Sequence, residues 1–151
     1  MSFTQAYSAI RKISAAGDEI SYPGLNEKQV LLSPARLIPA VQILLENDIY
    51  HLSTITGVYE DEQLYLLYHF WDREGLTLRV PVDFLQDQIQ TLTQLIPGAL
   101  FYEREIAEMF GVHINGLDTS QKMFLPDNWE GGAPMRREST SIPVNEKSEG
   151  Q

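Results

Sequence analysis

The sequence has no cysteine among its 151 residues. This absence excludes disulfide bonds, thiolate-ligated metal sites, cysteine-ligated iron–sulfur clusters and a cysteine nucleophile from the chain. Basic residues are also scarce, because 11 lysines and arginines stand against 21 aspartates and glutamates, a net charge of −10. Binding to nucleic-acid phosphates needs clustered lysine and arginine, so we expect no nucleic-acid partner. The acidic balance suits solubility or a basic partner surface.

Long apolar runs are missing as well. No window approaches the ~20 apolar residues that a membrane-spanning helix needs, and the first 17 residues lack the continuous apolar segment of a signal peptide. We therefore expect a chain that reaches a membrane only through partners. The hydrophobic fraction of 43% is nevertheless enough for a core, and 151 residues suit one domain.

Hydrophobic periodicity predicts an α+β fold of helix, strand, helix, three strands and helix. We expect a two-layer sandwich in which a small mixed or antiparallel sheet is covered by helices, followed by an extended C-terminal tail. The domain is expected to span 1–132, and the tail, 133–151, to be extended or disordered. The predicted helices lie at 3–15, 33–48 and 101–110, and the predicted strands at 29–33, 49–59, 63–72 and 75–83.

Three local features refine this prediction. Ser33 is placed to cap a helix with Pro34 in its first turn, and Pro39 predicts a helix that begins late or is kinked. The segment 75–83 alternates aliphatic residues with Thr77, Arg79 and a proline, which predicts a strand with one buried face.

The stretch FYEREIAEMFG, residues 101–111, places four charged residues among aromatic and aliphatic ones before a glycine. Arg104, Glu105 and Glu108 fall opposite an apolar arc on a helix, and Glu103 lies at the seam. The pattern favours a solvated face with an Arg104–Glu108 pair. Residues two apart point about 200° apart, so Glu103 and Glu105 do not easily face one substrate. The predicted arc consists of Tyr102, Ile106, Met109 and Phe110.

No motif in the sequence predicts a catalytic, metal or cofactor site. His51, His69 and His113 have no metal-ligand spacing, and we expect structural roles for them. Nucleophile-elbow, dinucleotide-binding and phosphate-loop motifs are missing too. Phe124 and Trp129 lie in a loop-rich region, where an aromatic side chain either packs locally or anchors an interface.

The runs PGALFYEREIAEMFGVHINGLD and FLPDNWEGGAPMRRE resemble the 30 kDa-type peripheral-arm subunit of respiratory complex I. They are also similar to its homologues in energy-converting membrane-bound [NiFe] hydrogenases and formate hydrogenlyases. The resemblance covers about residues 30–138. Departures from the usual motif include Tyr102, Glu108 and Ala133. The motif residues, which the resemblance places at subunit interfaces, are Glu103, Arg104, Glu105, Glu108, Phe110, Gly111, Trp129, Pro134, Arg136 and Arg137.

This resemblance implies a non-catalytic structural subunit of a membrane-associated NADH/quinone oxidoreductase or a related hydrogenase complex. Such a subunit positions a large 49 kDa-type or [NiFe]-hydrogenase-like subunit and the iron–sulfur subunits, and its tail packs on these partners. It carries no cofactor, since the clusters and the quinone or [NiFe] site belong to the partners. The implied location is peripheral, on the cytoplasmic face of the membrane.

Two alternatives stay open from the residues alone. The chain could be a stand-alone soluble adaptor that uses its aromatic C-terminal region, or an acidic hydrolase that uses Glu103 and Glu105. The electron donor, the electron acceptor and the pumped ion do not follow from the sequence.

Overall fold

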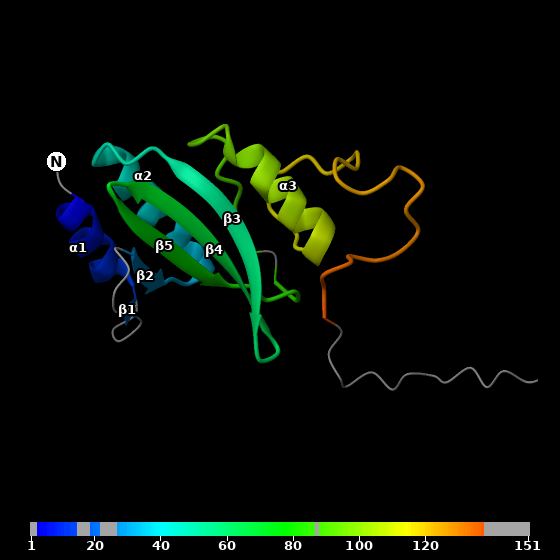
Figure 1. Cartoon of the computed structure of the whole chain (residues 1–151), viewed down its shortest axis with the longest axis horizontal. Helices are drawn as coiled ribbons and strands as arrows, with labels where there is room; N and C mark the ends of the chain where they lie inside the picture. Colours follow the sequence, from blue (N-terminus) through cyan, green and yellow to red (C-terminus); the bar gives the residue numbers. More distant parts are fainter. Residues whose placement is uncertain (1–2, 15–18, 22–26, 87, 138–151) are drawn as a thin grey trace, which may run out of the picture.

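The computed structural model describes residues 3–14, 19–21, 27–86 and 88–137. Within these ranges, helices and strands form the α+β fold that the sequence predicts, with one further short strand, β1, which it does not (Figure 1). Residue 15, where the first predicted helix ends, and residues 138–151 lie outside the described residues. The elements are α1 (Phe3–Ile13), β1 (Glu19–Ser21), β2 (Glu27–Leu31), the 3-10 turn η1 (Pro34–Arg36), α2 (Leu37–Glu46), β3 (Leu52–Glu60), β4 (Gln63–Asp72), β5 (Glu74–Pro81) and α3 (Ala99–Phe110).

The strands form one mixed sheet in the order β1-β2-β5-β4-β3. β2 runs parallel to β5, and the other neighbours are antiparallel. Tight turns join β3 to β4 and β4 to β5, and Asp61 and Arg73 take positive φ angles of 54° and 61° there. The long β4 strand has the bounds that the sequence predicts, and its residues alternate between partly exposed and buried from Gln63 to Phe70.

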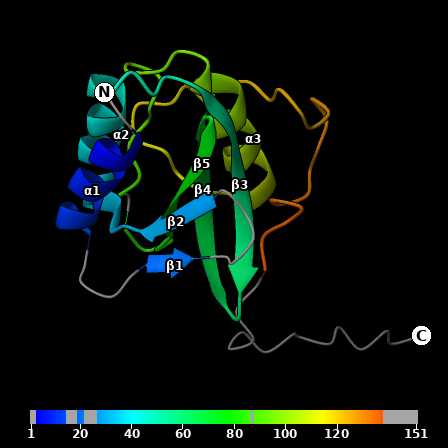
Figure 2. The same cartoon turned by 60° about the vertical axis from the view of Figure 1, so that its left-hand side comes forward.

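The helices lie on one side of this sheet, which we call the inner face. Leu66, Tyr68 and Phe70 of β4 point to this side and are fully enclosed in the core. Figure 1 shows α2 behind the strands, and Figure 2 shows α1 and α2 together on one side of them. The opposite, outer face carries the intervening residues of β4, among them Tyr65 and Trp71.

β5 differs from its prediction, because both of its faces are buried. Thr77 and Arg79 point to the outer face, yet they are only 5% and 7% exposed. The Arg79 guanidinium lies 3.9 Å from the centre of the Tyr65 ring and pairs with Glu60. Side chains of β4 and β3 therefore enclose a charge that the alternating sequence places in solvent.

The start of α2 follows from its prolines. Ser33 and Pro34 begin the 3-10 turn as predicted, although the Ser33 side chain makes no capping hydrogen bond. The α-helix begins only at Leu37, so Pro39 falls in its first turn. Backbone N–H groups in that turn have no partner within the helix, so a proline there costs little. The predicted late start is confirmed.

α3 covers the β3 end of the inner face, and Gly57 of β3 makes this close packing possible. A Cβ atom at Gly57 would lie 2.4 Å from Cε2 of Phe110. Tyr59, two residues further on, places its ring centre 6.2 Å from that of Phe110. None of the helices in the described ranges is long and apolar enough to cross a membrane.

Candidate functional site

The helix α3 carries the charged motif and ends where the sequence predicts. Ala99, Ile106 and Phe110 are buried against the sheet and form most of its apolar side. Gly111 caps the C-terminus in the left-handed conformation, with φ of 69°, and its N–H donates to the carbonyl of Ala107. This conformation strains any residue with a Cβ, which explains a glycine at this position.

Glu103 is completely enclosed, although the sequence places it only at the seam of the helix. Its carboxylate accepts two hydrogen bonds of 2.6 Å, from the backbone N–H of Leu92 and from the hydroxyl of Thr91. Both donors belong to the segment between β5 and α3, which also forms a parallel bridge between Gln90 and Asn115. Glu103 therefore serves this chain by fastening that segment to α3.

Burial sets the ionisation of this carboxylate. Removal from water raises the pKa of Glu103, while the hydrogen bonds from Leu92 and Thr91 oppose the rise. The enclosed hydroxyl of Tyr68 has no hydrogen-bond partner among the described residues. Burial, with a smaller contribution from the charge of Glu103, raises the pKa of Tyr68. Both groups lie inside the core.

Arg104 and Glu108, predicted to pair with each other, instead hold the loop that follows α3. The Arg104 guanidinium donates to the backbone carbonyl of Gln121. The two carboxylate oxygens of Glu108 accept from the backbone N–H groups of Met123 and Phe124, at 2.5 and 2.7 Å. Charge-assisted bonds of this kind are stronger than neutral ones. The motif therefore fixes the position of a loop that contains no regular secondary structure.

This loop presents exposed apolar side chains. We call four of them the apolar loop group: Met123, Phe124, Trp129 and Met135, which are 38%, 44%, 39% and 56% exposed. Trp129 donates its indole N–H to the carbonyl of Gly132 at 3.0 Å, and its own carbonyl accepts from the Lys122 ammonium at 2.5 Å. The group is thus partly solvent-facing while its backbone is held in place.

The described part of the predicted tail folds back onto the same chain. The N–H of Met135 donates to the carbonyl of Met109 at the end of α3, at 2.8 Å. Arg137 donates its backbone N–H to the hydroxyl of Tyr59 at 3.0 Å, and its guanidinium lies 4.9 Å from the centre of that ring. Residues 133–137 therefore contact the body of the domain.

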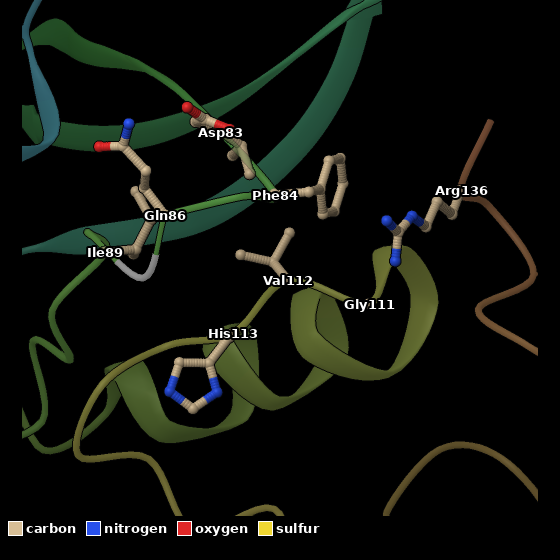
Figure 3. A pocket seen from close by; sticks show the side chains of 9 residues that line it. Asp83, Phe84, Gln86, Ile89, Gly111, Val112, His113 and Arg136 are labelled. Carbon is tan, nitrogen blue, oxygen red and sulfur yellow. The ribbon is translucent and has the colours of Figure 1, made fainter. Parts of the chain in front are cut away.

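A small pocket of about 80 Å³ lies where this tail meets the end of α3. The Arg136 guanidinium lies 4.0 Å from the centre of the Phe84 ring, and Figure 3 shows the two groups pointing toward each other. Gly111 lines the same pocket, and a Cβ there would meet Ala133 at 3.3 Å and Arg136 at 3.4 Å. The close approach of the tail thus gives Gly111 a second role besides capping.

The predicted site residues fall into four environments. Glu103 and Phe110 are buried in the domain, and Glu105 is exposed on α3. Gly111 and Arg136 meet at the pocket. The remaining members surround the loop and tail: Arg104, Glu108, Trp129, Pro134 and Arg137.

Sequence reasoning missed Tyr59, Phe84 and Thr91, which receive Arg137, Arg136 and the Glu103 carboxylate. Each contact joins residues that are at least 12 positions apart. No local pattern marks such partners, because a single aromatic or threonine in a strand or loop has many possible roles.

Two of the three histidines, His69 and His113, contact polar side chains of the same chain, as expected for structural histidines. The ring nitrogens of His69 lie 3.2 Å from the Thr56 hydroxyl and 2.9 Å from the Thr77 hydroxyl. Burial lowers the pKa of His69. His113 lies 3.1 Å from the side-chain oxygen of Asn115, and His51 is exposed. No group of three possible metal ligands occurs in the described ranges.

The family model for the respiratory-chain NADH dehydrogenase 30 kDa subunit matches residues 30–143. An NADH-quinone oxidoreductase subunit of Roseiflexus sp. (strain RS-1) is 28% identical over 118 residues, which cover 72% of this chain and 67% of that protein. Formate hydrogenlyase subunit 5 of Escherichia coli (strain K12) is 34% identical over 65 residues, 42% of this chain but only 11% of that protein.

The fold is similar to that of a chain in a solved respiratory complex. That structure is of the membrane-bound sulfane sulfur reductase, an archaeal respiratory membrane complex. The TM-score is 0.70 at 20% sequence identity, and the match covers 88% of this chain and 82% of the other. At this identity the likeness establishes the fold.

Proposed function

The chain belongs to the family of the respiratory-chain NADH dehydrogenase 30 kDa subunit, and from this premise we propose a structural role within a complex I-like or related hydrogenase-like membrane complex. It positions the large 49 kDa-type or [NiFe]-hydrogenase-like subunit relative to the iron–sulfur subunits. Electrons pass through clusters and a quinone or [NiFe] site held by those partners, and this chain supplies no cofactor. Within this complex, the chain lies peripherally at the cytoplasmic face of the membrane.

The observation that carries this proposal is the apolar loop group, held by the charges of the motif. Methionine, phenylalanine and tryptophan are enriched in the cores of protein interfaces. A loop already fixed by Arg104 and Glu108 loses less conformational entropy when a partner covers it. The arrangement therefore suits a permanent interface between subunits, with Phe124 and Trp129 as its anchors.

In this proposal, the motif residues have different roles. Glu103 acts indirectly, by holding α3 to the preceding segment. Arg104 and Glu108 shape the contact loop, and exposed Glu105 is available to a basic group of the partner. The exposed Arg136 and Arg137 rest on aromatic rings of this chain, and one side of each remains for the partner.

The alternative of a hydrolase that uses Glu103 and Glu105 has no support in the geometry. The Glu103 carboxylate is enclosed and already accepts two hydrogen bonds, whereas Glu105 is exposed on α3. A carboxylate pair that acts on one substrate must share a cleft at about 5 to 10 Å separation. A soluble adaptor remains the second candidate, and the same exposed loop favours it.

Replacing Phe124 by serine should weaken assembly because it removes an exposed anchor without disturbing the core. We expect a tagged wild-type chain, purified from solubilised membranes of its own organism, to carry the large and iron–sulfur subunits. We expect Phe124→Ser to recover at least several-fold less of them, with an unchanged unfolding temperature. Mass spectrometry of the purified material provides the measurement.

Tyr50→Ser is the matched control, because Tyr50 is also an exposed aromatic but lies between α2 and β3. It should recover partners as the wild type does. Reproducible absence of redox subunits from the wild-type sample would contradict the subunit role and favour the adaptor. A recovered large subunit with paired CxxC motifs would indicate a hydrogenase, and one without them a quinone reductase.

A further inference from the structure

The outer face of the sheet is a second surface, distinct from the apolar loop group. Figure 1 looks onto this face, and none of the helices in the described ranges lies in front of it. Val58 and Trp71 point to this side and are 36% and 46% exposed, and Tyr65 and Leu67 between them are partly exposed. The face therefore has an apolar and aromatic strip along β3 and β4.

Hydrogen bonds across the strands make this face rigid. His69 of β4 joins Thr56 of β3 to Thr77 of β5, at 3.2 and 2.9 Å. Arg79 of β5 donates to the side chain of Gln29 in β2 at 3.3 Å. Such fixed polar groups reduce the entropy that a partner must remove on binding.

Carboxylates mark both ends of the strip. The turn between β3 and β4 carries Asp61 and Glu62 beside Glu60, which pairs with Arg79, and the turn between β4 and β5 carries Asp72 and Glu74 beside Arg73; all six residues of the two turns are exposed. The ten residues of β4 separate the two turns, a span of about 30 Å at ~3.3 Å per residue. An apolar centre between acidic ends has its complement in a partner with an apolar centre and basic ends.

We propose that the outer face of the sheet binds a basic amphipathic helix of a neighbouring subunit, laid along β4 with its apolar side on Val58, Leu67 and Trp71. The inference rests on the subunit role proposed above and adds a second interface to it. Lysine or arginine at the two ends of the helix meets the acidic turns. A span of about 30 Å corresponds to about 20 residues of α-helix.

Charge disfavours the other occupants. A second copy of this chain, with a net charge of −10, repels the acidic turns. Residues 138–151 contain three glutamates and one lysine, so this segment has the same sign of charge as the turns. A basic partner is the occupant that the surface attracts.

Photo-crosslinking in the assembled complex tests this interface. p-Benzoylphenylalanine replaces Val58 or Trp71 in the full-length chain, and mass spectrometry identifies the captured peptides after irradiation of the membranes. Positions 58 and 71 lie about 20 Å apart along the strands, so one helix captured by both should be labelled at points about 13 residues apart. Gln42, exposed on α2 behind the sheet, is the control position and should capture no such peptide.

The same reagent at Phe124 reports on the proposed subunit role separately. Capture of one basic helical segment from positions 58 and 71 supports the inference. Capture at 124 with none at 58 and 71 overturns it while leaving the subunit role intact. Capture of an acidic segment, of residues 138–151 or of a second copy also overturns it. No capture from any of the three positions, with no redox subunit in the purified sample, contradicts both proposals.

A charge variant gives an independent measurement. Glu74→Lys should lower recovery of the captured partner several-fold at low salt, and high salt should reduce the difference, because exposed charges are screened. Glu46→Lys, which reverses an exposed charge on α2, should leave recovery unchanged. Equal recovery for the two variants would contradict the role of the acidic turns.

Discussion

At the scale of the residue, Glu103 is a buried ionisable group whose hydrogen bonds lie within the chain. Its carboxylate is fully enclosed and binds the N–H of Leu92 and the hydroxyl of Thr91. Without the two carboxylate oxygens, the Leu92 N–H and the Thr91 hydroxyl would be buried and unpaired, and each would lower the free energy of unfolding by about 1–3 kcal/mol. Glutamine retains an acceptor for Leu92, while its amide can donate to the hydroxyl oxygen of Thr91, so Glu103→Gln tests the charge more than the packing.

Glu103→Gln should change how the free energy of unfolding depends on pH. Burial raises the pKa of Glu103 above its ordinary value of 4.5. At pH values just above 4.5, the folded chain therefore binds more protons at this group than the unfolded chain does. The contribution of this proton to the free energy of unfolding is complete below pH 4.5, and it is lost as the pH rises through the pKa of Glu103 in the folded chain. Each unit of difference in pKa corresponds to ~1.4 kcal/mol.

We therefore expect the unfolding free energy of the wild type to fall relative to that of Glu103→Gln as the pH rises from 4.5. Urea titrations across pH 4.5 to 8 measure the unfolding free energy of both proteins. Subtracting one from the other removes the contributions of the other titrating groups, which the two proteins share. Glu105→Gln, at an exposed position of the same helix, should follow the wild type. Parallel curves for wild type and Glu103→Gln would contradict the expectation.

At the scale of the element, the packing of α3 on β3 depends on the missing side chain of Gly57. Gly57→Ala places a methyl group 2.4 Å from the Phe110 ring, so helix and strand must separate or the ring must leave its position. Overpacking of this kind costs about 1–3 kcal/mol. We expect a lower thermal unfolding temperature, measured by circular dichroism.

A smaller partner should relieve that clash. Phe110→Leu removes the ring, so the double variant Gly57→Ala/Phe110→Leu should be more stable than the sum of the single effects implies. Gly98→Ala is the matched control, because a Cβ at Gly98 meets no atom within 4 Å. Strict additivity of the two substitutions would show that the packing distance does not limit this interface.

At the scale of the whole molecule, the boundary expected at residue 132 separates segments that are in contact. Met135 binds the backbone of Met109, Arg136 lies on Phe84, and Arg137 binds Tyr59. A chain that ends at 137 should therefore unfold at a higher temperature than one that ends at 132. Differential scanning calorimetry of the two truncated chains makes the comparison, and equal temperatures would mean that these contacts add no stability.

Features that depend on a short stretch of sequence were predicted correctly, whereas features that depend on contacts between strands were missed. The bounds of β4 follow from a run of strand-favouring residues that ends at turn residues, and the late start of α2 follows from Pro39. β1 was missed because three residues, EIS, carry no periodicity of their own and are a strand only through pairing with β2. The burial of Arg79 was missed because Tyr65 and Glu60, which enclose it, lie on two other strands, β4 and β3.

The sequence by itself determined the α+β class, the apolar side of α3, its glycine cap and the family, because these depend on residue types at short, fixed spacings. Only the tertiary structure decided what the motif charges do. Glu103 turns inward to Thr91 and Leu92, whereas Arg104 and Glu108 reach forward to the loop. The groups that they bind are backbone N–H and carbonyl groups and one hydroxyl, which are common in every sequence. Only the folded chain therefore determines which of these groups each charged side chain binds.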